Sequence, residues 1–271
     1  MFRLLLVFTL VMLSAYAYSA KVVTFSVYSQ AMKKDVPNTI ILPKGYSAES
    51  GSLPVLYALH GATDDHTFWP TIVPKIQEFA DQYGIIVVCP DGAKTSWYID
   101  SPIDPSFQYE TYISRELVNY VDNTFNTQTD KSSRAIMGLS MGGFGAFYLA
   151  IRNTNVFSAA ISTSGAFDLR PFPNNWDIAK RIGSQTEYPT NWENYSVVNM
   201  AGLLKGKSLA LFFDIGVDDF FYNGNKEFHQ TLQSMQIPHS YLEMPGGHTL
   251  EYWQNSINYH FVFLDEHFKA N

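Results

Sequence analysis

Short apolar runs alternate with longer segments of helical periodicity from residue 21 to the end of the chain. Continuous apolar runs are typical of β-strands buried on both faces, as in a parallel sheet. Segments in which apolar residues recur every three or four positions predict helices. The pattern predicts strands at 22–27, 38–42, 55–59, 85–89, 135–139, 159–162, 209–213 and 240–244, and helices at 71–82, 110–125, 144–150, 224–235 and 250–268.

The alternation of strands and helices predicts an α/β fold with a mainly parallel sheet covered on both faces. The chain has 271 residues, of which 46% are hydrophobic and 16% are charged. This size and composition suit one domain with a large core, which we expect at 20–271. The segment 165–207 breaks the alternation with weak periodicity and many aromatic residues. Long irregular insertions are usually functional, so we expect a small cap there.

The first 19 residues have the pattern of an export signal. Arg3 precedes an apolar run at 4–13, which is followed by small residues at 14–17. A helix needs about 20 apolar residues to span a bilayer, and this run is shorter. We therefore expect a signal peptide at 1–19 that is cleaved between 17 and 20, leaving no membrane span. An uncleaved anchor is the alternative.

Charge and cysteine content bear on partners and compartment. The net charge is −7 and the chain has no basic run, so nucleic acid is not expected as a partner. Cys89 is the single cysteine, which excludes an internal disulfide. An exported protein without disulfides suits a bacterial periplasm or cell surface. The sequence leaves the oligomeric state open.

Ser140 lies in the most informative motif of the chain. The run Gly138-Leu139-Ser140-Met141-Gly142 follows an apolar strand and precedes an apolar helical segment. In a Gly-x-Ser-x-Gly nucleophile elbow, the chain turns sharply between strand and helix and presents the serine at the turn. The flanking glycines are needed because a Cβ there would collide with the adjacent backbone. A glycine-rich turn with an idle serine is the alternative.

A nucleophilic serine requires a base and a carboxylate that orients the base. In one arrangement the acid follows the elbow and the histidine comes last. His248 lies after the final predicted strand, where such a base is expected. Asp214, Asp218 and Asp219 follow the strand at 209–213 and compete for the acid position. Asp219 is favoured because it lies deeper in the loop, whereas Asp214 is too close to the strand, and Asp218 is the alternative.

Acyl transfer also requires hydrogen-bond donors for the oxyanion of the tetrahedral intermediate. The amide of Met141, directly after the nucleophile, is the first candidate. The second donor is expected from the loop after the strand at 55–59, where Gly61 lets the backbone turn inward. The amide of Ala62 is the predicted donor of this loop.

His60 and the run Asp64-Asp65-His66 contain residue types that bind metals. Neither a helix nor paired cysteines give them metal-ligand spacing, so we expect a solvated loop, no metal and no cofactor. Aromatic residues make up 15% of the chain, a surplus that suits a pocket for flat or sugar-like substrates. The candidate substrate contacts, each of which could equally pack in the core, are Trp69, Trp97, Tyr98, Trp176 and Trp192.

Together these motifs resemble the esterase D-like branch of the α/β-hydrolases. That branch includes tributyrin esterases, S-formylglutathione hydrolases, feruloyl and acetylxylan esterases, and mycolyltransferases. The resemblance covers nearly the whole chain after the signal and implies the α/β-hydrolase fold. It also implies that Asp219 is the acid and that the amide of Ala62 serves the oxyanion. The segments that carry it are 42–46, 54–61, 90–92, 96–98, 109–112, 116–117, 138–143, 216–220 and 245–248.

The resemblance implies an exported serine carboxylesterase with a Ser-His-Asp acyl-enzyme mechanism. The expected substrates are acetyl or feruloyl esters on plant polysaccharides. A broad short-chain esterase or an acyltransferase is the alternative on the same fold, and a non-catalytic binding protein is a more remote one. Hydrolysis of S-formylglutathione is less expected, because that cytosolic branch often differs at His60-Gly61 and lacks export signals.

Overall fold

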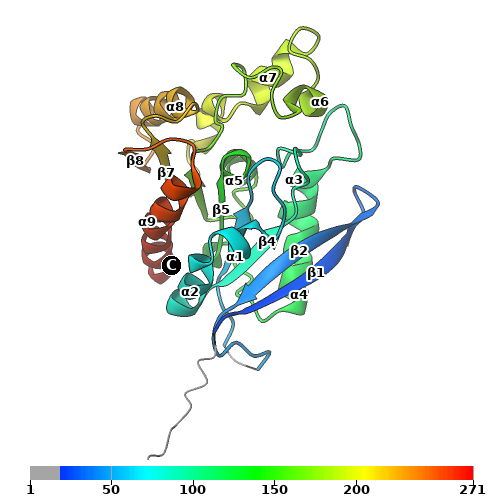
Figure 1. Ribbon diagram of the computed structural model, residues 1–271, viewed down its shortest axis with the longest axis vertical. Coiled ribbons are helices and arrows are strands. Elements are labelled where there is room, and N and C mark those ends of the chain that lie inside the picture. Colours follow the sequence, from blue (N-terminus) through cyan, green and yellow to red (C-terminus); the bar gives the residue numbers. More distant parts are fainter. Residues whose placement is uncertain (1–18, 50, 271) are drawn as a thin grey trace, which may run out of the picture.

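The computed structural model describes residues 19–49 and 51–270. Across these residues eight strands form one sheet in the order β1-β2-β4-β3-β5-β6-β7-β8 (Figure 1). Strands β3 to β8 are parallel to one another, and β1 and β2 extend the sheet in antiparallel fashion. This is the sheet of the α/β-hydrolase fold, as the sequence predicted. The predicted signal peptide at 1–19 lies, apart from its last residue, outside the described residues and stays a prediction.

The predicted strands are all present, with bounds that shift by a few residues. They are β1 (Lys21–Ser29), β2 (Lys34–Leu42), β3 (Val55–Leu59), β4 (Ile86–Pro90), β5 (Arg134–Leu139), β6 (Ala159–Thr163), β7 (Ala210–Gly216) and β8 (Ser240–Met244). The helices are α1 (Phe68–Ile72), α2 (Lys75–Tyr83), α3 (Tyr109–Thr111), α4 (Val118–Thr124), α5 (Met141–Arg152), α6 (Ile178–Ile182), α7 (Pro189–Tyr195), α8 (Tyr222–Ser234) and α9 (Leu250–Lys269).

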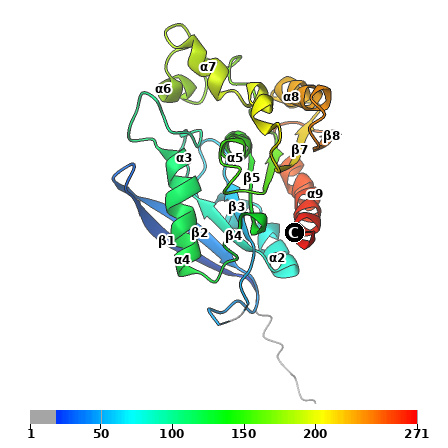
Figure 2. The same ribbon diagram turned by 180° about the vertical axis from the view of Figure 1, so that it is seen from behind.

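The core lies on both faces of the sheet. Helices α1, α2 and α9 cover one face, where the rings of Phe79 and Phe261 stack with centroids 4.6 Å apart. Helices α4, α5 and α8 cover the other face (Figure 2). There Phe147 packs edge-on against Phe213 and Phe228. Every residue of β3, β4, β5 and β6 is buried, which explains their continuous apolar runs.

Two predicted helices differ in detail from the structure. The helix predicted at 71–82 is wrong as a single element, because α1 ends at Ile72 and α2 begins at Lys75. Val73 precedes a proline, which disfavours the helical conformation, and its φ of −123° and ψ of 63° end α1. The helix predicted at 110–125 is continuous, but a π-helical segment at Tyr112–Leu117 joins α3 to α4.

The insertion at 165–207 contains α6, α7 and two 3₁₀ turns, and α6 and α7 lie together at one end of the molecule (Figures 1 and 2). It is fastened to the loop that follows β4. The guanidinium of Arg181 donates to the carbonyl of Thr95 at 2.9 Å and lies 3.5 Å from the ring centroid of Phe107. The prediction that this insertion acts as a cap stays a prediction. In the described ranges, no helix is long and apolar enough to cross a membrane.

Candidate active site

Three loops at the carboxyl ends of β5, β7 and β8 bring together Ser140, Asp219 and His248. The Nε2 atom of His248 lies 2.9 Å from Ser140 Oγ, and its Nδ1 lies 2.9 Å from Asp219 Oδ2. An ionised carboxylate only accepts hydrogen bonds, so Nδ1 carries the ring proton toward Asp219. Nε2 is then free to accept the proton of the serine hydroxyl. The residues are 79 and 29 positions apart in sequence (219 − 140 and 248 − 219), and the fold alone joins them.

The backbone presents Ser140 in a strained conformation. Its φ is 55° and its ψ is −119°, at the junction of β5 and α5. A residue with a Cβ pays about 1–3 kcal/mol to adopt such a sparsely populated conformation, so neighbouring bonds must hold it. The Ser140 amide donates to the carbonyl of Thr163 at 3.1 Å, and its carbonyl accepts from the amide of Phe144 at 3.0 Å. The hydroxyl therefore points out of the sheet edge toward His248.

The loops that carry Asp219 and His248 are joined by their backbones. The amide of Asp218 donates to the carbonyl of Gly246 at 2.9 Å. Gly246 has a φ of +127°, which favours glycine, and a Cβ on Gly216 would lie 2.2 Å from the Gly246 carbonyl oxygen. The loop of Asp219 and the loop of His248 are therefore held against each other by their backbones.

The Asp219 carboxylate is fully buried, and its Oδ1 accepts from the amide of Phe221 at 2.9 Å. The imidazole of His248 is enclosed by aromatic rings. The centroid distances are 4.4 Å to Phe220, 5.4 Å to Phe221 and 5.0 Å to Trp253. Sequence reasoning missed these three residues as parts of the site. The signal for two of them was present, since Phe220 and Phe221 directly follow the acid.

The other two aspartates considered for the acid position lie elsewhere. Asp218 is exposed, whereas Asp214 is buried and accepts from His260 Nε2 at 2.6 Å. Asp214 also accepts from the hydroxyl of Thr163 at 2.7 Å. This buried group of side chains ties α9 to β6 and β7 beneath the site. Of the three aspartates, Asp219 is the one that contacts His248.

The loop that contains Gly61 and Ala62, predicted to bind the oxyanion, lies beside Ser140. A Cβ on Gly61 would be 3.7 Å from the Cβ of Ser140. Within the described part of the chain, neither the Ala62 amide nor the Met141 amide donates a hydrogen bond to another protein group. The role of these two N–H groups as oxyanion donors stays a prediction.

His60 shapes this loop from beneath. Its Nε2 accepts from the amide of Gly92 at 2.8 Å, so Nδ1 carries the proton and donates to the carbonyl of Gly61 at 2.7 Å. Burial lowers the pKa of His60 and keeps the ring neutral. The hydroxyl of Tyr98 donates to the carbonyl of His60 at 2.9 Å.

The residues considered for metal binding have other contacts. His66 Nδ1 lies 2.8 Å from the hydroxyl of Thr39, and Asp65 accepts from the amide and hydroxyl of Thr67 at 2.9 and 2.6 Å. Among residues 19–49 and 51–270, no group of three or more His, Cys, Asp or Glu side chains is placed to hold a metal ion.

Four of the five predicted substrate contacts are core residues, which corrects that prediction. Trp69, Trp97, Tyr98 and Trp192 are each 2% exposed or less. Their polar atoms bind backbone carbonyls, as the indole of Trp69 does with Leu59 at 3.1 Å and that of Trp192 with Gly183 at 3.0 Å. Such residues leave no surface for a ligand. Trp176 is half-buried and lies near the site, in stacking contact with Phe220.

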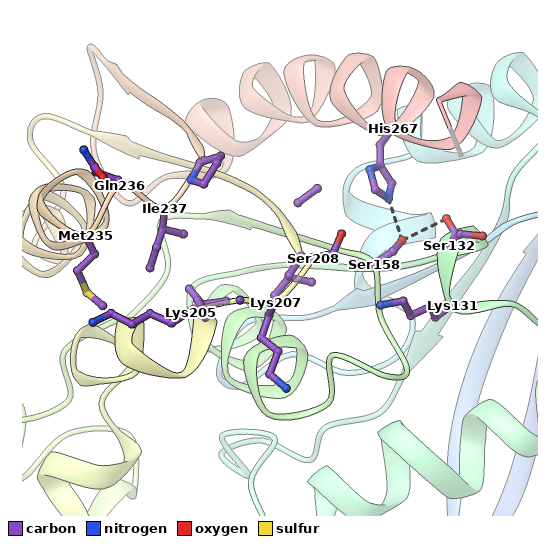
Figure 3. Close-up of a pocket in the computed structure, with 15 residues that line it drawn as sticks. Lys131, Ser132, Ser158, Lys205, Lys207, Ser208, Met235, Gln236, Ile237 and His267 are labelled. Carbon is purple, nitrogen blue, oxygen red and sulfur yellow. Dashed lines mark hydrogen bonds between the residues drawn. The ribbon is translucent and has the colours of Figure 1, made fainter.

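A hollow of about 670 Å³ lies at the opposite, amino-terminal edge of the parallel strands. Figure 3 shows Lys131, Lys205 and Lys207 around it, with His267 Nε2 2.8 Å from the hydroxyl of Ser158. It is lined by residues that precede β5, β6, β7 and β8, whereas the triad follows β5, β7 and β8. This hollow is therefore separate from the candidate active site.

Replacing His60 by glutamine should reduce the pH dependence of stability. The unfolded chain binds a proton near the ordinary pKa of 6.5, whereas folded His60 binds one only at lower pH, so acid favours unfolding. Below about pH 6.5, His60 lowers the free energy of unfolding of the wild type by up to about 1.4 kcal/mol per pH unit. This loss continues until the pH reaches the pKa of His60 in the folded protein. Urea unfolding of both proteins from pH 7 to pH 5 measures the slopes. If the free energy of unfolding depends on pH equally in both proteins, the pKa of His60 is not lowered in the folded state.

Comparison with known proteins identifies the family. Residues 29–264 match the family model described as "Putative esterase". An esterase of Mycobacterium tuberculosis is 29% identical over 235 residues, which cover 77% of this chain and 51% of that protein. The chain thus spans about half the length of this curated relative. An acetyl esterase of Caldicellulosiruptor saccharolyticus is 24% identical over 264 residues, covering 88% of this chain and 96% of the relative.

Solved structures agree with this family. A ferulic acid esterase superposes with a TM-score of 0.79 at 27% identity, covering 93% of this chain and 99% of the other. An S-formylglutathione hydrolase of Staphylococcus aureus has the same fold, with a TM-score of 0.78 at 22% identity over 91% of this chain and 99% of the other. With the family model matched over most of its length, the chain belongs to this esterase family of the α/β-hydrolases.

Proposed function

We propose that the protein is a serine carboxylesterase that acts through an acyl-enzyme on Ser140. The observation that carries this proposal is the hydrogen-bonded series Ser140 Oγ, His248 and Asp219, with both contacts at 2.9 Å. A serine hydroxyl becomes a nucleophile when a neighbouring base accepts its proton and a carboxylate orients that base. Membership of the esterase family supports an ester carbonyl as the electrophile.

In this mechanism Ser140 Oγ attacks the ester carbonyl carbon while His248 Nε2 takes the hydroxyl proton. The carbonyl oxygen becomes an oxyanion, which the amides of Ala62 and Met141 bind. The tetrahedral intermediate collapses as the C–O bond to the alcohol breaks, and His248 gives its proton to the departing alkoxide. A water molecule then attacks the acyl-enzyme with His248 again as base, and the carboxylic acid and the Ser140 hydroxyl are released. Asp219 stabilises the imidazolium that forms in each half-reaction.

Substituting the triad should abolish most turnover of p-nitrophenyl acetate. Ser140→Ala is expected to lower kcat by about 10⁶, and Asp219→Asn by about 10⁴ because the imidazole loses its orienting acceptor. Asp218→Asn is the matched control, since Asp218 is the neighbour of Asp219 in the sequence and is exposed. An unchanged rate in Ser140→Ala would end the proposal. A loss in Asp218→Asn as large as that in Asp219→Asn would reassign the acid.

The proposed natural substrates are acetyl or feruloyl esters on plant polysaccharides. Support comes from the ferulic acid esterase and the acetyl esterase that the chain is similar to. A broad short-chain esterase or an acyltransferase is the competing proposal on this fold. A panel of methyl ferulate, acetylated xylan and tributyrin, with product analysis, should show the highest kcat/KM on one of the first two. Highest activity on tributyrin, or acylated sugar as the main product, would favour the competitor.

Export to the periplasm or cell surface is also part of the proposal. Its support is the signal-like pattern of residues 1–19. In a bacterial host the mature protein should be recovered outside the cytoplasm with an N-terminus between residues 18 and 21. Recovery of a full-length cytoplasmic protein would oppose this part of the proposal and leave the chemistry untouched.

A further inference from the structure

We propose that Phe172, Trp176 and Phe220 form a binding subsite for an aromatic ring carried by the ester substrate, and that Trp97 is the residue that positions it. We call these three side chains the aromatic shelf. The inference rests on the proposed esterase function and narrows its substrates to esters with a planar ring near the carbonyl.

The shelf begins at the catalytic base. The ring of Phe220 lies 4.4 Å from the imidazole of His248, yet the residue is 51% exposed. Trp176 stacks on Phe220 with centroids 5.8 Å apart and planes 20° from parallel. Phe172 meets Trp176 at 5.5 Å and Phe220 at 6.4 Å. A series of contacting aromatic rings thus extends from His248 through Phe220 to Trp176 and Phe172. Exposing a Phe ring to water is unfavourable, and a ring-bearing ligand would cover it.

The backbone that holds Trp176 is strained. Trp176 and Asp177 have φ values of 44° and 55°, and Trp97 and Tyr98 have values of 58° and 55°. Left-handed φ is unfavourable for residues with a Cβ and persists where surrounding contacts enforce it, often at ligand sites. The two pairs bind each other, because the Trp97 indole donates to the Trp176 carbonyl at 2.9 Å. Nearby, the hydroxyl of Thr95 donates to the Asp177 carboxylate at 3.2 Å.

The same strained pair contacts the oxyanion loop. While Trp97 holds Trp176, the next residue, Tyr98, donates from its hydroxyl to the carbonyl of His60. The Tyr98 ring fills space that requires glycine, since a Cβ on Gly92 or Gly145 would lie 2.3 or 2.5 Å from it. The distance between the oxyanion amides and the shelf is therefore set by two adjacent, buried residues. A rigid spacing of this kind suits a rigid substrate, in which a planar ring is conjugated to the carbonyl.

Equilibrium binding tests the shelf without turnover. In the Ser140→Ala background, calorimetry compares methyl cinnamate with its ring-saturated analogue, methyl (E)-3-cyclohexylacrylate. Contacts between aromatic rings stabilise a complex, so Phe220→Ala and Trp176→Ala should each lower the affinity for methyl cinnamate about three- to tenfold. The affinity for the saturated analogue should fall less. Tyr259→Ala removes a similarly exposed ring, 49% exposed on α9, and should leave both affinities unchanged. Unchanged methyl cinnamate affinity, or equal losses for both ligands, would overturn the shelf.

The positioning role of Trp97 is tested by steady-state kinetics with the active enzyme, which retains Ser140. Trp97→Phe keeps an aromatic ring against Phe144 but removes the donor to Trp176. It should raise KM for methyl cinnamate at least about threefold relative to KM for the aliphatic ester vinyl butyrate. Trp192→Phe removes an equally buried indole–carbonyl bond, to Gly183, and should leave this ratio unchanged. A ratio that Trp97→Phe does not change, or that both variants change alike, would overturn the positioning role.

The two levels of the proposal fail separately. If the wild type hydrolyses vinyl butyrate while the shelf variants bind methyl cinnamate as well as their parent does, the esterase function stands and the shelf falls. If the wild type hydrolyses no ester at all, the proposed function falls, and the binding measurements still decide whether the shelf takes an aromatic ring.

Discussion

The position of the Ser140 hydroxyl depends on a turn that has no room for side chains. A Cβ on Gly138 would lie 2.2 Å from the carbonyl oxygen of Gly142, and a Cβ on Gly142 would lie 2.3 Å from that of Leu59. Strand β5, helix α5 and the end of β3 therefore meet backbone to backbone. This contact fixes the strained serine and, on its other side, places Gly61 and Ala62 beside it. The conformation of Ser140 and the position of the proposed oxyanion loop both follow from this one close approach of backbones.

His248 reaches this turn because the loops that follow β7 and β8 are bonded to each other. The bond from the Asp218 amide to Gly246, and the tight contact of Gly216 with the same residue, couple the acid loop to the histidine loop. Beneath them the buried pair Asp214 and His260 fastens α9 to the sheet. The described part of the chain thus contains two histidine–aspartate pairs, of which one faces a serine and the other is enclosed in the core. The two aspartates differ in their place along the chain: Asp214 lies within β7, whereas Asp219 lies beyond the end of that strand.

The sequence was sufficient for the sheet and for the order of the site residues, because both follow from local signals. Buried parallel strands have apolar runs, and the elbow and the loop after β8 contain glycines at positions where the backbone needs them. The sequence was insufficient where tertiary contacts decide. Trp69 and Trp192 are buried by partners that no local pattern reveals. The exposed ring of Phe220 beside His248 and the left-handed conformation of Trp176 arise from contacts between segments more than 20 residues apart.

Covalent labelling measures whether His248 activates Ser140 as a nucleophile. The protein is treated with a fluorophosphonate, which reacts with activated serines, and the modified residue is located by peptide mass spectrometry. We expect one adduct, on Ser140, whose formation is strongly slowed in His248→Ala. An unlabelled Ser140 in folded protein, or labelling at the same rate without the imidazole, would contradict it.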